Sequence, residues 1–191
     1  AVSFADMQAI QADVALPDAQ HFVPFIAQAM ARAAASTAHP LLAGLASQPA
    51  VQEAASRLAA WSFRSPTGIP QGYDASDVDG VLGAPAPQEI ADSVAATLYN
   101  VWRGRFIANT IDTTFGGVPL PPGVSLPKPS ADLTLTALKG LLERPQPGVG
   151  ASGLNFFNVP GVAGAADRRD ILVLKSLADT LAQLAGPAYA A

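Results

Sequence analysis

Apolar residues recur at intervals of three and four in six stretches of this chain, and that spacing places them on one face of an α-helix. In the first stretch, from Ser3 to Asp13, Phe4, Met7 and Ile10 fall on one side. No stretch shows the clear alternation of apolar and polar residues that marks a β-strand. The sequence therefore predicts a mainly α-helical fold, an irregular array of helices joined by long Pro/Gly-rich loops. The other predicted helices cover residues 18–35, 47–61, 87–112, 130–144 and 167–184.

Several predicted helices carry residues that favour a helix end or a bend. Ser3 and Asp6 have the spacing of a capping box, in which the hydroxyl and the carboxylate each accept a bond from the other residue's backbone. Ser47 is predicted to cap the third helix. Asp170, near the start of the last helix, is expected to interact with the helix dipole. Pro24 predicts a kink in the second helix or a later start.

Three long irregular segments separate the predicted helices. Residues 62–86, 116–129 and 145–166 are rich in glycine, proline or both, and the middle segment contains five prolines. Loops longer than about 12 residues are uncommon in a self-contained domain, and they usually serve a function or lie on another part of the protein. We therefore expect residues 1–191 to form a single helical unit that is a fragment of a larger chain, with both ends cut.

Composition excludes several classes of protein. Half of the residues are hydrophobic and 14% are charged, so the chain has enough apolar surface for a core and is not predicted to be disordered. The net charge of −4 argues against nucleic acid or an anionic membrane as a partner. The pairs Arg103/Arg105 and Arg168/Arg169 are interpreted as solvated helix faces. No run of roughly 20 apolar residues predicts a membrane span. Without cysteine there is no disulfide and no thiolate metal site.

The acidic loop Y-D-A-S-D-V-D-G is the candidate for a metal site. Asp74, Asp77 and Asp79, followed by Gly80, supply the oxygen ligands that calcium prefers. A calcium-binding EF-hand loop also requires a glutamate at its twelfth position, and counting from Asp77 that position is Gln88. We interpret the segment as a solvated turn and predict no metal ligand.

No other pattern predicts a catalytic or cofactor site. The two histidines, His21 and His39, have no partner at the spacing of a metal site, and a catalytic triad is recognised by geometry rather than composition. The glycines of the loops match neither a dinucleotide-binding nor a phosphate-binding pattern, so no cofactor is predicted. Five aromatic residues on helical stripes are assigned to the core: Phe22, Phe25, Trp61, Trp102 and Phe106.

Three of the helical stretches resemble helices in the β-chain of penicillin-amidase-family hydrolases. The segment from Ser3 to Asp13, S-F-A-D-M-Q-A-I-Q-A-D, is similar to the family's sxxdmxxiQxD helix. The stretch from Ala50 to Trp61 is similar to a helix that ends in L-x-x-W, and Asp92 to Arg103 resembles an S-A-x-x-x-x-x-x-W helix. In this order they cover residues 3 to about 112. One departure is Ser62, where the family usually has Asp after the tryptophan.

The resemblance implies a larger α+β N-terminal-nucleophile hydrolase. In such enzymes a terminal Ser, Thr or Cys attacks an amide, and an Asn helps to stabilise the oxyanion. The resemblance places both groups before the helix that begins at Ser3, and Ala1 has only a methyl side chain. We therefore predict no catalytic residue in this chain.

The sequence analysis predicts a non-catalytic helical scaffold of a parent that cleaves N-acyl amide bonds. The resemblance leaves open β-lactam side chains, acyl-homoserine lactones or other N-acyl compounds as substrates, and implies a periplasmic or secreted location. The expected partner is the remainder of the parent hydrolase, with self-association through exposed apolar surface as a further expectation. The alternatives are a self-standing helical protein-binding module and a small metal-dependent enzyme.

Overall fold

The structure is a computed structural model that describes residues 2–11, 13–66, 84–126 and 129–188. Most of these residues are helical, and the only β-bridges among them are isolated ones, Ala15 with Arg64 and Val149 with Asn155. The prediction of a mainly α-helical fold is confirmed. The helices are α1 (Phe4–Gln11), α2 (Pro17–Ala33), α3 (Pro40–Ala46), α4 (Pro49–Ala59), α5 (Pro87–Ile107), the π-helix η1 (Ala108–Asp112), α6 (Thr113–Gly116), α7 (Ala131–Glu143) and α8 (Ala165–Leu184).

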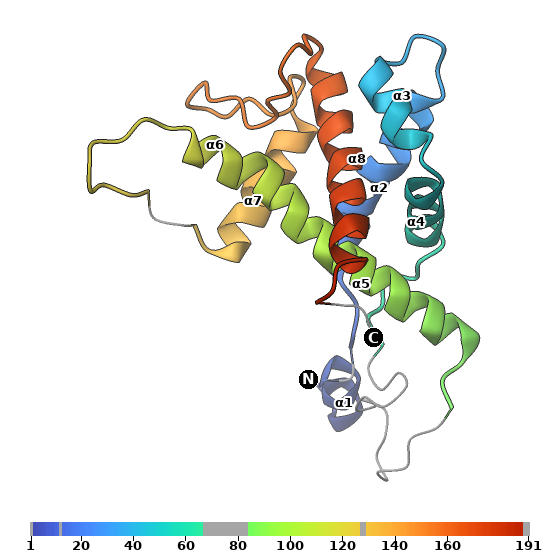
Figure 1. Ribbon diagram of the computed structural model, residues 1–191. Coiled ribbons are helices and arrows are strands. Elements are labelled where there is room, and N and C mark those ends of the chain that lie inside the picture. Colours follow the sequence, from blue (N-terminus) through green and yellow to red (C-terminus); the bar gives the residue numbers. More distant parts are fainter. Residues whose placement is uncertain (1, 12, 67–83, 127–128, 189–191) are drawn as a thin grey trace.

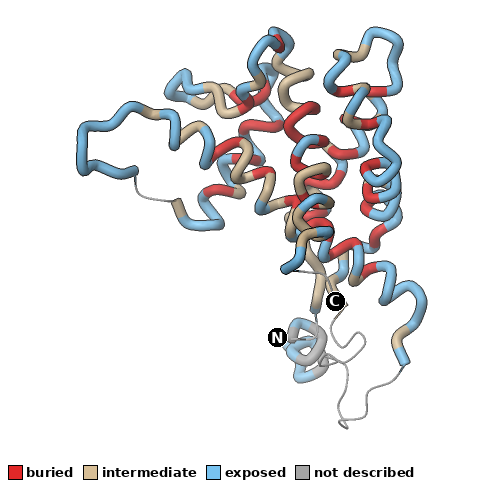
Figure 2. The backbone as a smooth tube through the Cα atoms, in the orientation of Figure 1, coloured by how far each residue is buried: buried red, intermediate tan, exposed pale blue. Residues whose placement is uncertain are grey.

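Helix α8 forms the centre of the body. It contacts α2, α3, α4, α5 and η1, and the long helix α5 crosses it (Figure 1). The buried residues gather where these helices meet (Figure 2). In α8 four consecutive residues, 171–174, are buried, so this helix has core on more than one side. A helix that is apolar over most of its circumference belongs in the middle of a helical array.

A chain of neighbouring aromatic rings runs along α5. Tyr99, Trp102 and Phe106 lie at helical spacing, and their ring centroids are 6.0 and 5.1 Å apart. Trp61 extends the chain at one end, 5.6 Å from Tyr99, and Phe157 extends it at the other, 5.9 Å from Phe106. All five side chains are buried, and the predicted core roles of Trp61, Trp102 and Phe106 are confirmed. Aromatic pairs at these separations add about 0.5–1.5 kcal/mol each to the effect of burial.

A buried carboxylate joins α2 to α8. Asp170 is completely buried, and it pairs with Arg32 of α2 at 3.0 Å and with Arg169 at 2.7 Å. The N–H bonds of Arg32 do not point at Asp170 Oδ2, so that contact is an ion pair without a hydrogen bond. The predicted dipole role of Asp170 is wrong, because α8 begins at Ala165 and places this residue beyond the first turn.

The basic pairs are anchors of the fold rather than solvated faces. Arg103 Nη1 donates to Asp18 Oδ2 at 2.7 Å, which links α5 to α2, and Arg105 Nε donates to Gln183 Oε1 on α8. Arg168 donates to three backbone carbonyls, those of residues 157, 162 and 163. The interpretation as solvated faces is therefore wrong. The acceptors of Arg103 and Arg105 lie on distant helices, whereas those of Arg168 lie in the loop just before α8, where the folded path of the backbone places them.

The N-terminal half contains one helix that the sequence did not predict. The turn at His39 opens α3, with Pro40 in its first turn. Ser47 ends α3 and donates to a carbonyl of that helix, so its predicted role as the cap of the next helix is wrong; Gln48 takes that place. Helix α2 begins at Pro17 and continues through Pro24, so the predicted later start is also wrong.

The long helix α5 is followed directly by a short π-helix. Residues 108–112 form η1, which follows α5 directly, and α6 continues from it. Thr110 is buried there and its hydroxyl donates to the carbonyl of Phe106. Asn109 donates to Ser176 at 3.0 Å and to Asp179 at 2.8 Å, which fastens η1 to α8. Short π-helical segments are rare and are frequently found at functional sites.

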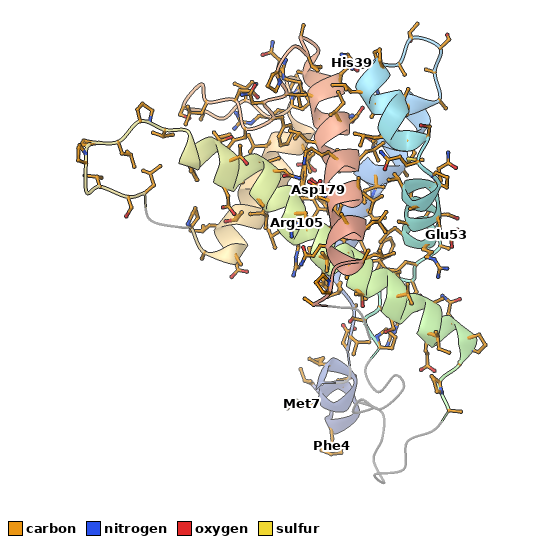
Figure 3. All side chains as sticks on the ribbon, viewed as in Figure 1. Phe4, Met7, His39, Glu53, Arg105 and Asp179 are labelled. Carbon is orange, nitrogen blue, oxygen red and sulfur yellow. The ribbon has the colours of Figure 1, made fainter. Side chains whose placement is uncertain are left out.

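Helix α1 lies away from the rest of the body (Figure 1). The predicted capping box is present: Ser3 N donates to Asp6 Oδ2 at 2.8 Å, and Asp6 N donates to Ser3 Oγ at 3.1 Å. These bonds from Ser3 lower the pKa of Asp6. The apolar side chains of this helix are exposed, with Phe4 at 78% and Ile10 at 68%. Labelled Phe4 and Met7 are drawn apart from the main body in Figure 3.

The loop between α7 and α8 packs on the helices of the chain itself. Phe157 from this loop is completely buried in the core. Gly148 has a φ of +88°, and a Cβ at this position would lie 2.5 Å from the Phe157 side chain, so only glycine fits. This loop therefore does not require another chain to cover it. In the Pro-rich segment after α6, in contrast, Leu120, Val124 and Leu126 are exposed.

Candidate functional site

A hollow lies beside the π-helix. It has a volume of about 440 Å³, within the usual range of about 300–1,000 Å³ for ligand pockets. One wall comes from η1 and α6, a second from α7, and the third from the loop that follows α7. Its lining residues are Ile111, Phe115, Pro129, Leu133, Thr134, Thr136, Ala137, Gly140, Leu141, Arg144, Gly150, Ala151 and Phe156.

Two adjacent phenylalanines of this loop lie in different places, one in the core and one in the wall of the hollow. Phe157 enters the core, whereas Phe156 lines the hollow and meets Phe115 edge to face, with ring centroids 5.7 Å apart. Gly150 lies against Phe156, and a Cβ there would come within 3.0 Å of the ring. The loop is thus held by both rings, and the hollow has a defined aromatic wall.

Both histidines contact other residues of the helices. His21 lies on α2 between the rings of Phe22 and Phe25, with its Nε2 atom 3.4 Å from Glu143 Oε1. Nε2 is buried and makes no hydrogen bond with this carboxylate, so the contact is electrostatic. His39 caps α3, and its Nδ1 accepts a bond from the backbone N–H of Leu41 at 3.2 Å. The two histidines therefore have contacts that serve the packing and capping of helices.

A polar cluster around Asp92 was not found from the sequence. Asp92 is 5% exposed on α5, and its carboxylate accepts from the Ser62 hydroxyl, from the Ser62 backbone N–H and from Gln88 Nε2 at 2.8 Å. The segment after α4 is fastened to α5 in this way. Ser62 is the departure from the family pattern, and an aspartate there would face the Asp92 carboxylate with like charge. The donor hydroxyl of serine suits this buried acceptor.

A second buried hydroxyl lies at the junction of α2 and α5. The Tyr99 hydroxyl donates to Asp18 Oδ2 at 2.7 Å, and Arg103 contacts the same carboxylate oxygen. Burial and this hydrogen bond raise the pKa of Tyr99. The arrangement stabilises the neutral phenol and joins two helices.

The candidate metal loop, Asp74, Asp77, Asp79 and Gly80, lies outside the described residues, and so does Ala1. Within the described ranges, no three His, Asp or Glu side chains come together as a metal site would require. A search of the same residues for a helix long and apolar enough to cross a membrane found none.

The fold is thus a helical array whose clustered polar groups, in the part described, fasten helices to one another. Its sequence matches the profile of the penicillin amidase family over residues 1–191, the whole chain. The chain therefore belongs to the penicillin amidase family, as the three helical stretches indicated. Searches of curated proteins and of solved structures gave no match.

The hollow, the π-helix and the buried Asp92 are the features that sequence reasoning missed. The different positions of Phe156, in the hollow, and Phe157, in the core, had one weak sequence signal. The two residues form an apolar pair within a glycine-rich loop. No local sequence signal marks the π-helix, because the helical period of apolar residues continues through Phe106 and Ile111. Only the packing of distant segments brings these residues together.

Proposed function

We propose that this chain is the helical scaffold of a hydrolase that cleaves N-acyl amide bonds. The observation that carries the proposal is the match to the penicillin amidase family across all 191 residues. In this proposal the chain supports the rest of the enzyme mechanically. Helices α5 and α8 cross and pack against each other, and contacts of charged side chains fasten α2 and η1 to them. The remainder of the parent hydrolase supplies the nucleophile and is the chain's principal partner.

The contacts of the polar residues support a non-catalytic role for the described part of the chain. The hydroxyl, carboxylate and imidazole groups that are candidates for catalysis are engaged with other helices or with helix ends. None of the serine hydrogen bonds described connects a hydroxyl to either histidine, whereas nucleophile activation requires a neighbouring base. We therefore expect the purified 191-residue chain to be inactive.

An amidase assay tests this proposal. The chain is incubated with chromogenic anilides that carry an aromatic or a straight-chain acyl group, beside the longer parent protein. We expect turnover by the parent and none by the chain, because removing an activated nucleophile typically lowers the rate about 10⁶-fold. Mass spectrometry on the parent is expected to show self-cleavage before a Ser, Thr or Cys. Turnover by the chain that survives repurification and is abolished in His21→Ala or His39→Ala would contradict the proposal.

A second candidate function is a self-standing helical module that binds another protein. The exposed apolar face of α1 would then be its binding surface, since such faces are sites of association. A gene whose reading frame continues far beyond both ends of these residues supports the scaffold, whereas a frame that ends near them supports the module. Sedimentation of the purified chain adds a separate measurement, since the uncovered face of a scaffold is expected to give dimers or larger species.

The location is part of the same proposal. We infer a periplasmic or secreted parent from the family resemblance, and an export signal at the start of the parent gene is the expected feature. Cell fractionation of the parent tests it. Recovery of the mature parent only in the cytoplasm would contradict this location.

A further inference from the structure

The hollow beside the π-helix has the shape and charge of a small-molecule site. Along α7, the residues that line it include Leu133, Ala137 and Gly140, which are spaced by four and three positions and so share one face, and Arg144 directly follows the last residue of the helix. At a rise of about 1.5 Å per residue this face is about 10 Å long. The opposite face of α7, with Leu138 and Leu142, is buried in the core. Helix α7 therefore contributes one face to the hollow and the opposite face to the core.

The middle of this face is open because its residues are small. A Cβ at Gly140 would meet no atom within 4 Å. The hollow is also lined by Ile111 and Leu141, which are 3% and 5% exposed, and by the ring of Phe156. An apolar ligand in this position would exchange water for carbon contacts along its length, which is favourable by about 25 cal/mol per Å² of apolar surface removed from water.

Among the described residues that line the hollow, Arg144 is the one with a charged side chain. Its Nη1 donates to the carbonyl of Val149 at 2.8 Å, and this bond holds the guanidinium at the end of α7. The other guanidinium donors have no acceptor among the described residues, and the neighbouring Glu143 contacts His21 instead. A guanidinium carries its charge at all relevant pH values and binds carboxylates through two parallel donors.

We propose that this hollow binds a straight-chain monocarboxylate, with the apolar chain along α7 and the carboxylate at Arg144. A cation at one end of a mainly apolar hollow fits one anionic head and one apolar tail. A cationic ligand would be repelled by Arg144, and a strongly polar ligand would leave the apolar lining without a matching surface. The proposal involves no reaction, so it stands independently of the proposed amide hydrolysis.

Calorimetric titration of the 191-residue chain with decanoate, below the concentration at which it forms micelles, tests the proposal. Decanol is the matched neutral probe. A ligand of this size in an open site is expected to bind with a Kd of about 0.1–1 mM. Arg144→Gln is expected to weaken decanoate about fivefold to tenfold and to leave decanol unchanged, because only the carboxylate loses its partner.

Gly140→Leu extends a side chain into the hollow from a position where a Cβ meets no atom within 4 Å, and it is expected to weaken both probes at least about tenfold. Leucine favours a helix more than glycine does, so this variant is expected to fold, which circular dichroism verifies. The matched control is Gly44→Leu, another exposed helical glycine with open space around it, on α3. The control is expected to bind both probes as the unmodified chain does.

Three results would overturn the proposal. The first is the absence of saturable decanoate binding to the unmodified chain. The second is decanoate binding that Gly140→Leu leaves intact, or that Gly44→Leu reduces equally, since either places the probe elsewhere. The third is a decanoate affinity that does not change in Arg144→Gln, because the carboxylate would then have no role in recognition.

Discussion

Helices α1 and α5 carry the same kind of apolar pattern and have opposite environments. In α5, Leu98, Trp102 and Phe106 recur at intervals of four and are at most 6% exposed. In α1, Phe4, Met7 and Ile10 recur at intervals of three and are at least 52% exposed. Both helices form, and α1 even has a complete capping box. The difference lies in what surrounds them, because α8 crosses α5 while α1 lies apart from the main body (Figure 1).

This comparison separates two contributions to helix stability. Capping and spacing act within one segment, and each contributes about 1 kcal/mol or less. Burial of a large side chain contributes several times more, but it requires a partner from elsewhere in the chain. We therefore expect the stability of the whole fold to depend on α5 and its contacts, and to be insensitive to the apolar face of α1. Four experiments test this expectation, in order of decreasing effect.

The largest effect is expected for Trp102→Ala. Trp102 is completely buried, stacks on Phe106 and donates through Nε1 to the carbonyl of Val173 at 3.0 Å. Its removal leaves a cavity and should lower the free energy of unfolding by about 3–5 kcal/mol. Urea denaturation measures the loss, and Trp102→Phe, which keeps part of the stack, should lose less. A loss below about 1 kcal/mol in the alanine variant would mean that α5 is not the centre of stability.

Asp170→Ala is expected to lower the free energy of unfolding by about 3 kcal/mol. The substitution leaves the Arg169 and Arg32 guanidiniums, which are 13% and 40% exposed, without their buried carboxylate partner. Glu53→Ala is the matched control, because it breaks a surface ion pair with Arg57 within one helix. That pair should contribute only about 0.3–0.5 kcal/mol. Equal losses in the two variants would contradict the role assigned to the buried pair.

Tyr99→Phe is expected to lower the free energy of unfolding by about 1 kcal/mol, because it removes the hydrogen bond to Asp18. It should also change the dependence on pH. The pKa of Tyr99 is raised in the folded state, so its contribution is fully present below the ordinary tyrosine pKa of about 10 and decreases as the pH rises beyond it. Denaturation between pH 8 and about 11 should show a steeper loss in the unmodified chain than in Tyr99→Phe. Parallel curves would contradict this account.

The smallest effect is expected for Phe4→Ala and Met7→Ala. Both side chains are exposed, so each substitution should change the free energy of unfolding by less than about 0.5 kcal/mol. Their effect on association is expected to be larger, and sedimentation should show less self-association in the double variant. A loss of stability above about 1.5 kcal/mol that depends on protein concentration would show that another copy covers α1 in solution.

The helices were predicted from patterns that involve only residues close together in the sequence. The period of Leu98, Trp102 and Phe106 and the Ser3–Asp6 capping box lie within single segments, and the structure confirms both. Errors arose where the folded backbone or a distant partner decides the outcome. Asp170 was assigned to the helix dipole because nothing nearby in the sequence marks its contact with Arg32 on α2. Arg168 was assigned to a solvated face because the carbonyls that it binds, five to eleven residues away, approach it only through the folded path of the loop before α8. The same reason explains why the hollow was not predicted.

By itself, the sequence determined the helical class of the fold, the assignment of its large aromatic residues to the core and the resemblance to the penicillin amidase family, because side-chain period and segment similarity are properties of neighbouring residues. Tertiary structure alone decided which apolar face is covered, which charges are buried and where a hollow remains. The physical reason is that burial and ion pairing depend on the surroundings of a side chain, and those surroundings come from residues far away along the chain. Arg32 and Asp170, separated by more than half of the sequence and paired at 3.0 Å, illustrate this dependence.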